Sequence, residues 1–367
     1  MWAVTERADD PYRSRRDRLR TVAMLPLVVS PMAGGVSTPE LVIGACAAGA
    51  CGFVAGGYKR ADALDSEIAA VRAAGVTAFG VNIFVPGKPT AVPDATAAYV
   101  TSLEPDARAL GATLGDAVWD DDDYDAKLEV LTASAPPVVS FTFGIPAPEV
   151  VRSLQAAGTL VLCSVTTPEE ALEALRVDPD GLCLQGVEAG AHRASLVNDN
   201  RPDQDRSLRP LLAAVRRRSL VPLVAAGGVM GPDDVADLLA RGATLVQAGT
   251  AFLRCPESGA HPRYKAALSD PSTVTQAGMP GASNWTTITR AFSGRRARAL
   301  ANIMVRQHEG APAAYPEINN ATAPLRAAAA QAGDAAHMSL YAGTGFHAAT
   351  SRPVGDVVKW LASAVRP

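Results

Sequence analysis

Short runs of apolar residues alternate with longer stretches of helical composition, and this alternation constrains the fold more than any other feature of the sequence. The apolar runs are nearly continuous, which is typical of parallel strands covered on both faces. The β-then-α rhythm recurs about eight times, which predicts an α/β fold and favours a closed (β/α)8 TIM barrel. An open doubly wound sheet is the alternative. The expected strands cover residues 27–30, 51–55, 78–85, 137–141, 160–164, 181–185, 221–225 and 243–247.

Two stretches interrupt this rhythm. Residues 86–135 hold extra helices and the acidic run Asp120 to Asp123, which we expect to form a solvated face. Residues 256–349 predict an inserted, mainly helical second domain that caps the barrel and contacts the substrate. The barrel is then expected over residues 15–255, with a C-terminal helix within 350–367 returning to it. A basic cluster in the insertion predicts a solvated or domain-bridging face, with an acidic substrate as the alternative; it comprises Arg290, Arg295, Arg296 and Arg298.

Composition excludes several classes of function. The formal net charge is −3, so there is no basic excess for binding nucleic acid. The 5 cysteines have no metal-ligand spacing and suggest a reducing compartment. The pair Arg15-Arg16 is compatible with a twin-Arg export signal, but Pro26 and Pro31 break the apolar run that follows. No uninterrupted apolar run of about 18 residues stands out. We therefore expect a cytoplasmic protein that does not bind a membrane.

Two consecutive glycine-containing loops predict a phosphate-binding site. Gly227 and Gly228 follow the seventh strand, and Gln247-Ala248-Gly249-Thr250 follows the eighth. Glycines let backbone N–H groups approach a ligand, and a helix expected to begin near Thr250 adds a positive dipole. The loops after these two strands are the usual phosphate site of such barrels. A tight turn without a ligand is the alternative for either loop alone.

The loop after the sixth strand carries the candidate catalytic base. Gln185 ends that strand, so its amide is expected to face the barrel mouth, and Gly190 and His192 follow it. Histidine exchanges a proton near neutral pH, which suits a general base. Glu188 and His192 have helical metal-pair spacing, but Gly190 lies between them and no second histidine is near, so we expect no metal.

Two further segments are expected at the same mouth. Asn82 is a polar residue within the apolar third strand, and it fits either a hydrogen-bonded core amide or an amide directed at a heterocycle. The bend after the first strand, which includes Met32 and Ala33, offers backbone groups to the same ligand. The string Gly343-Thr344-Gly345 does not open a βαβ unit, so it is a weak dinucleotide signature.

Together these stretches resemble the nitronate monooxygenases, formerly called 2-nitropropane dioxygenases. The likeness runs from about Pro31 to Phe346, and the Gln–Gly–x–Glu–x–Gly–x–His string at 185–192 is its most specific part. The other landmarks are Pro31–Ser37, Phe79–Asn82, Val139–Gly144, Ala225–Val229, Gln247–Phe252, Thr289–Arg295 and Tyr341–Gly343.

The resemblance implies a flavoprotein with FMN and an oxidoreductase activity. It implies that O2 oxidises nitronates or nitroalkanes to a carbonyl compound and nitrite, via a flavin semiquinone, with His192 as the base that removes the α-proton of neutral nitroalkanes. Tyr341 and Thr344 take the family's substrate positions. FMN is expected to contact Met32, Ala33, Asn82, Gln185, Gly190, Gly227, Gly228, Gln247, Ala248, Gly249 and Thr250.

The sequence departs from the family pattern at three places. Thr142 stands where relatives often carry His, Ala191 replaces a Gly before the base, and Thr344 replaces a Gln. Two alternatives therefore stay open: an NAD(P)H-dependent FMN reductase of enoyl-thioester or quinone type, and a flavin-binding protein without turnover. The expected partners are a small nitronate or nitroalkane and O2, with a homodimer as the candidate assembly.

Overall fold

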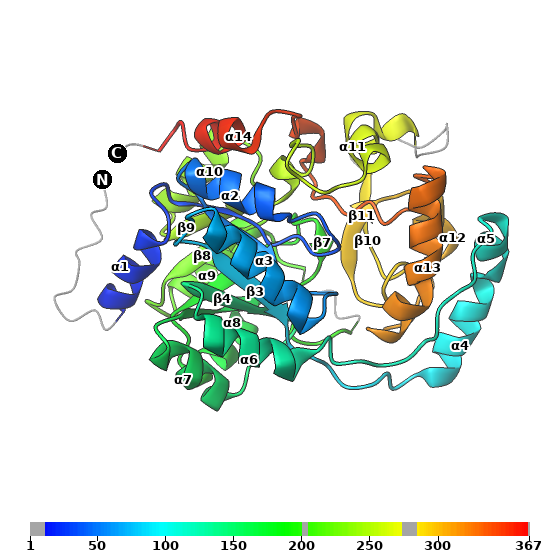
Figure 1. The fold of residues 1–367 in the computed structure, drawn as a ribbon, viewed down its shortest axis with the longest axis horizontal. Coiled ribbons are helices and arrows are strands. Elements are labelled where there is room, and N and C mark those ends of the chain that lie inside the picture. Colours follow the sequence, from blue (N-terminus) through cyan, green and yellow to red (C-terminus); the bar gives the residue numbers. More distant parts are fainter. Residues whose placement is uncertain (1–11, 200–204, 274–284, 366–367) are drawn as a thin grey trace.

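Eight parallel strands form a closed barrel, as the sequence predicts (Figure 1). The computed structural model describes residues 12–199, 205–273 and 285–365. The strand order is β1-β2-β3-β4-β5-β6-β8-β9, and every neighbouring pair is parallel. Burial on both faces explains why the strands are continuously apolar. The strands are β1 (Leu27–Val29), β2 (Cys51–Ala55), β3 (Gly80–Phe84), β4 (Val138–Thr142), β5 (Leu160–Val165), β6 (Gly181–Gln185), β8 (Leu223–Ala226) and β9 (Leu245–Ala248).

Helices cover the outside of the barrel. Several begin with proline in the first turn, where the missing N–H is not needed. The C-terminal helix α14 (Val354–Leu361) returns to the barrel and packs against α2 (Pro39–Ala47). A Cβ at Gly44 would lie 2.5 Å from Val354 Cγ1, so this glycine permits the close packing. The other barrel helices are α3 (Ala61–Ala73), α6 (Tyr124–Ser134), α7 (Pro148–Ala156), α8 (Pro168–Ala174), α9 (Leu208–Arg216) and α10 (Pro232–Ala240).

A short basic helix closes the amino-terminal end of the barrel. Leu19 of α1 (Arg13–Thr21) is buried against inward-facing residues of the strands, including Phe53. Arg15 forms an ion pair with Asp178 at 2.6 Å, which fixes the helix to the barrel. The ligand site is therefore confined to the opposite end of the barrel, where the strands have their carboxyl ends. No helix within the described ranges is both long and apolar enough to cross a bilayer.

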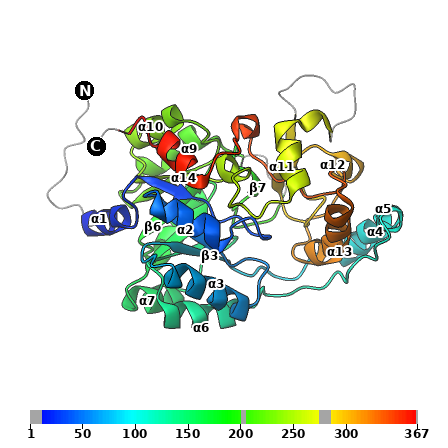
Figure 2. The ribbon, with the colours of Figure 1, turned by 45° about the horizontal axis from the view of Figure 1, so that its top comes forward.

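A second body lies beside the barrel and contains a three-stranded antiparallel sheet (Figures 1 and 2). Its order is β10 (Thr286–Thr289), β11 (Ala297–Leu300) and β7 (Ala191–His192), so one strand comes from the loop that follows β6. The helices of this region are α11 (Pro262–Ser269), α12 (Ile303–Gln307) and α13 (Glu317–Ala332).

Two of the helices between β3 and β4 pack onto this second body. Tyr99 of α4 (Pro93–Ser102) and Leu103 share a hydrophobic cluster with Phe292 and Leu325. Helix α5 (Glu104–Ala109) contributes Ala107 to the same cluster. We propose that the second domain comprises residues 256–349 together with residues 93–110.

The acidic run at 120–123 is not simply a solvated face, so that expectation is wrong. Asp122 accepts a hydrogen bond from the backbone N–H of Tyr58 at 2.9 Å. Its other carboxylate oxygen lies 2.8 Å from Nζ of Lys127, whose side chain is 1% exposed. Asp123 accepts a hydrogen bond from the N–H of Ala61 at 2.7 Å, at the start of α3. Burial raises the pKa of Asp122 to about 6. The run therefore anchors the β2–α3 loop.

Candidate active site

A cavity of about 400 Å³ lies at the carboxyl ends of the barrel strands, with one wall formed by the second domain. The structure brings nearly all the predicted site residues to this cavity. Thr344 is the exception, because it is exposed, does not line the cavity, and donates its N–H to Glu188 O at 3.0 Å. The residues that do line it are Met32, Ala33, Asn82, Gln185, Gly190, His192, Gly227, Gly228, Gln247, Ala248, Gly249, Thr250 and Tyr341.

His192 is positioned by the edge strand of the second sheet. Strand β7 pairs with β11, which places His192 opposite Ala297. The imidazole Nε2 lies 2.7 Å from the hydroxyl oxygen of Ser293, which is buried. The rings of Phe143 and Tyr341 pack against the imidazole at centroid distances of 5.8 and 5.1 Å. This surrounding fixes the ring and leaves it facing the cavity.

Burial keeps the His192 imidazole neutral. Burial, together with the nearby charges of Arg295 and Arg326, lowers the pKa of His192 to about 3. A neutral imidazole has one nitrogen free to accept a proton, as a general base requires. The residue before it, Ala191, has a φ of 62°, a conformation that glycine adopts more easily. Alanine at this position therefore adds local strain to the loop.

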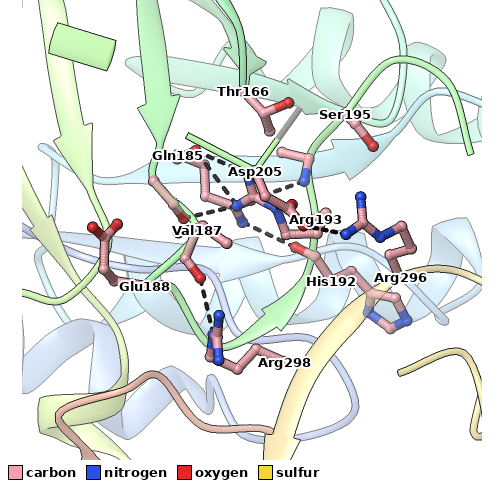
Figure 3. Close-up of polar contacts among 12 residues, drawn as sticks. Thr166, Gln185, Val187, Glu188, His192, Arg193, Ser195, Asp205, Arg296 and Arg298 are labelled. Carbon is pink, nitrogen blue, oxygen red and sulfur yellow. Dashed lines mark hydrogen bonds and ion pairs between the residues drawn. The ribbon is translucent and has the colours of Figure 1, made fainter. Parts of the chain in front are cut away.

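Gln185 holds the His192 loop in place, which the sequence did not predict (Figure 3). Its Nε2 donates to the backbone oxygen of His192 at 2.9 Å. Its Oε1 accepts from the N–H of Ala194 at 2.9 Å and from Nη1 of Arg193 at 2.7 Å. Arg193 in turn lies 3.5 Å from Asp205. Since both ends of the amide are engaged, we infer that Gln185 positions the base and has one N–H left for a ligand.

The two glycine loops present unused backbone donors. Gly227 and Gly228 have φ values of 124° and 69°, which side-chain-bearing residues rarely adopt. Among the described residues, none accepts a hydrogen bond from the N–H of Gly227, Gly228 or Gly249. The helix expected near Thr250 is a three-residue 3-10 turn, Thr250–Phe252. These N–H groups form a concave surface suited to an anionic group.

The floor of the cavity is a polar layer inside the barrel. Asn82 Nδ2 donates to Ser140 Oγ at 2.9 Å and to Thr142 Oγ1 at 3.0 Å. Thr142 Oγ1 donates to Ser164 Oγ at 3.3 Å, so the place where relatives often carry His belongs to this network. No donor among the described residues reaches Asn82 Oδ1. The amide of Asn82 is thus anchored through nitrogen and offers its oxygen to a ligand.

Most of the predicted arginine cluster bridges segments of the chain. Arg296 pairs with Asp205, and Arg298 donates to Val187 O at 2.9 Å (Figure 3). Arg295 is buried, and its Cζ lies 3.9 Å from the centroid of the Phe143 ring. Burial lowers the pKa of Arg295 to about 10. These contacts agree with the domain-bridging interpretation rather than with direct binding of an acidic substrate.

Three features of the cavity were missed at the level of sequence. Ser293 contacts the His192 imidazole, Gln185 holds the backbone of His192, and Arg326 of α13 lines the cavity. Ser293 lies in the segment 289–295, which contributed to the family resemblance but suggested no role for this serine. Arg326 lies in an alanine-rich helix that offers no local pattern. In the described parts of the chain, no three His, Cys, Asp or Glu side chains lie close enough together to hold a metal ion.

Two nitronate monooxygenases are similar to this chain over most of its length. The nitronate monooxygenase from Pseudomonas aeruginosa is 33% identical over 349 residues, covering 93% of this chain and 96% of that protein. The one from Paraburkholderia phytofirmans is 33% identical over 346 residues, covering 92% of this chain and 91% of that protein.

Solved structures extend the comparison. A nitroalkane oxidase from Streptomyces ansochromogenes superposes with a TM-score of 0.88 at 44% identity, covering 95% of this chain and 97% of that chain. FabK from Thermotoga maritima superposes with a TM-score of 0.68 at 22% identity over 95% of each chain, which shows a shared fold alone. The profile of the family described as nitronate monooxygenase matches residues 16–363. The chain therefore belongs to the nitronate monooxygenase family of oxidoreductases.

Proposed function

We propose that this chain uses FMN and O2 to convert a nitronate or nitroalkane into a carbonyl compound and nitrite. One observation carries the proposal: a single cavity combines unused N–H donors on two glycine loops with a fixed, neutral imidazole. Membership of the nitronate monooxygenase family and the likeness to a nitroalkane oxidase support the choice of substrate.

The residues of the cavity fit FMN. The free N–H groups of Gly227, Gly228 and Gly249 suit the phosphate, because backbone donors of this kind bind anions without a charged side chain. The polar floor, with Asn82 Oδ1 and the Gln247 amide, offers hydrogen bonds to the edge of the ring. The remaining proposed contacts are Met32, Ala33, Gln185, Gly190, Ala248 and Thr250. When bound, FMN supplies electron transfer from the substrate to O2.

His192 would take the α-proton from a neutral nitroalkane. Ser293 and the Gln185 amide hold the imidazole and its backbone, so the base is oriented before the substrate arrives. Tyr341 packs on the imidazole and narrows the space beside it, and its buried hydroxyl completes no hydrogen bond with a described residue. Tyr341 is therefore the proposed substrate contact on the side of the second domain.

The test measures nitrite and flavin reduction on the same preparation. The purified protein should be yellow, release FMN on denaturation, and form nitrite from propane-2-nitronate under air. The protein is then mixed anaerobically with the nitronate, with NADH and with NADPH in three separate reactions. We expect the nitronate to reduce the flavin. A colourless protein that takes up no FMN would overturn the proposal. Rapid reduction by NADH or NADPH without nitrite formation would favour the reductase alternative.

A further inference from the structure

One permanently charged side chain faces the cavity. Among the described residues that line it, Arg326 is the only lysine or arginine, and no aspartate or glutamate is present. The rest of the wall consists of glycine, apolar, aromatic and neutral polar residues together with His192 and His261. Since His192 is neutral, the charge in the vicinity of the base is positive.

The guanidinium of Arg326 is held by neutral acceptors on its own helix. Its Nη2 donates to the backbone oxygen and to Oδ1 of Asn319, both at 2.9 Å. Its Nε donates to Thr322 Oγ1 at 3.2 Å. No described carboxylate lies within ion-pair distance of it, so its charge is not compensated within the wall. Asn319 and Thr322 fix its orientation, which lowers the ordering cost of binding an anion.

Arg326 lines the same cavity as His192 and Tyr341, and its charge acts on both of these side chains. Its charge lowers the pKa of His192 and opposes the rise in the pKa of Tyr341 that burial causes. The unused N–H donors of Gly227 and Gly249 belong instead to the barrel loops. Arg326 is carried by α13 of the second domain. The cavity thus has two separate features that attract anions, one on each body.

We propose that Arg326 determines specificity in this reaction by binding the anionic nitronate group beside His192, so that the preformed nitronate is preferred to the neutral nitroalkane. This inference rests on the proposed function and specifies that the preferred substrate is the anion. A nitronate carries its negative charge on two oxygens in one plane. The planar guanidinium matches such a pair of oxygens with parallel hydrogen bonds, which lysine cannot do.

The same charge disfavours the neutral substrate. Removing an α-proton would turn His192 into an imidazolium next to Arg326 and Arg295, in surroundings that already disfavour that charge. A nitronate needs no such proton transfer. The positive wall therefore favours the substrate that arrives as an anion.

Nitrate tests the anion site without turnover, because it is planar and carries one negative charge. Isothermal titration calorimetry would measure nitrate binding to the purified flavoprotein, its Arg326→Met and Arg326→Lys variants, and Arg72→Met as matched control. Arg72 lies on the outer helix α3, away from the residues that line the cavity, and donates to the backbone oxygens of Ser134 and Ala135. We expect Arg326→Met to weaken nitrate binding at least tenfold, Arg326→Lys to weaken it less, and Arg72→Met to bind as the wild type does.

Three results would overturn the inference. They are absence of nitrate binding to the wild type, equal binding by Arg326→Met, and loss of FMN from both Arg326 variants, which would assign the residue to the cofactor. Kinetics should agree, with Arg326→Met raising KM for the nitronate at least tenfold and leaving KM for the neutral nitroalkane within twofold. Absence of nitrite from the wild type would overturn the proposed function, whereas the nitrate titration would still decide the role of Arg326.

Discussion

Replacing Gly190 by alanine should separate the His192 loop from the segment that follows α13. A Cβ at Gly190 would lie 2.5 Å from Gly343 N, 2.6 Å from Ala342 C and 2.8 Å from Ala342 Cα. All three are backbone atoms, and Gly343 N–H is already bonded to Thr250 Oγ1 at 3.0 Å. Ordinary contact begins at 3.4 Å, so the two segments must move apart by about 0.9 Å, the difference between 3.4 and 2.5 Å.

This displacement should lower the catalytic rate strongly and the stability of the fold only slightly. Overpacking of this kind costs about 1–3 kcal/mol. Because His192 lies two residues from the substituted position, the base should shift by a similar distance, and a misplacement of about 1 Å can lower the rate about 100-fold. We therefore expect nitrite formation from a neutral nitroalkane to fall about 100-fold, with a small decrease in the thermal unfolding temperature.

The matched control is Gly87→Ala. No atom lies within 4 Å of a Cβ built there, and its φ lies outside the left-handed range, so activity and stability should stay at wild-type values. Initial rates of nitrite release and thermal unfolding of both variants make the comparison. Activity of Gly190→Ala within threefold of the wild type would refute the reasoning, because it would show that contact with 342–343 does not set the position of the base.

Three further predictions concern buried polar groups. The folded pKa of His192 is about 3, below its ordinary 6.5, so the stability it contributes falls as pH drops below 6.5. Between pH 7 and pH 5, the free energy of unfolding of His192→Gln, measured in urea, should therefore fall by about 2 kcal/mol less than that of the wild type. An equal fall in both proteins would contradict this. Lys127→Met should lower the free energy of unfolding by about 3–5 kcal/mol at pH 8 and by clearly less at pH 5, because Asp122, with its pKa of about 6, is then protonated. A decrease that does not depend on pH would refute the pairing of Lys127 with Asp122. Ser293→Ala should lower kcat for a neutral nitroalkane at least tenfold with normal FMN content, and full activity would remove Ser293 from the positioning of His192.

The barrel could be predicted because each strand is buried on both faces and each helix follows from local spacing. The predicted strands 51–55 and 181–185 coincide with β2 and β6, and the other strands differ by one or two residues at their ends. Val354 and Leu361 at helical spacing also predicted the returning helix α14. Such features depend on a few consecutive residues, which one sequence is enough to show.

The polar contacts of the site could be predicted only in part. Residue types and their places after strands predicted that His192 faces the barrel mouth, and it lines the cavity there. The hydrogen-bond partners of Gln185 depend on the conformation of the loop, which residue spacing does not determine. The acidic run at 120–123 was misinterpreted because a charge run is usually solvated, whereas Lys127 and the Tyr58 N–H are brought to Asp122 by tertiary structure. Arg326 lies far along the chain from the barrel loops, so only the assembled fold shows its position.

The pairing of β7 with β11 has a consequence for how the two bodies are joined. His192 is hydrogen-bonded to the second domain through its strand and tied to the barrel through the Gln185 amide. The imidazole thus belongs to both bodies at once. A ligand that separated the two bodies would have to break one of these two attachments, so the position of His192 depends on their staying in contact.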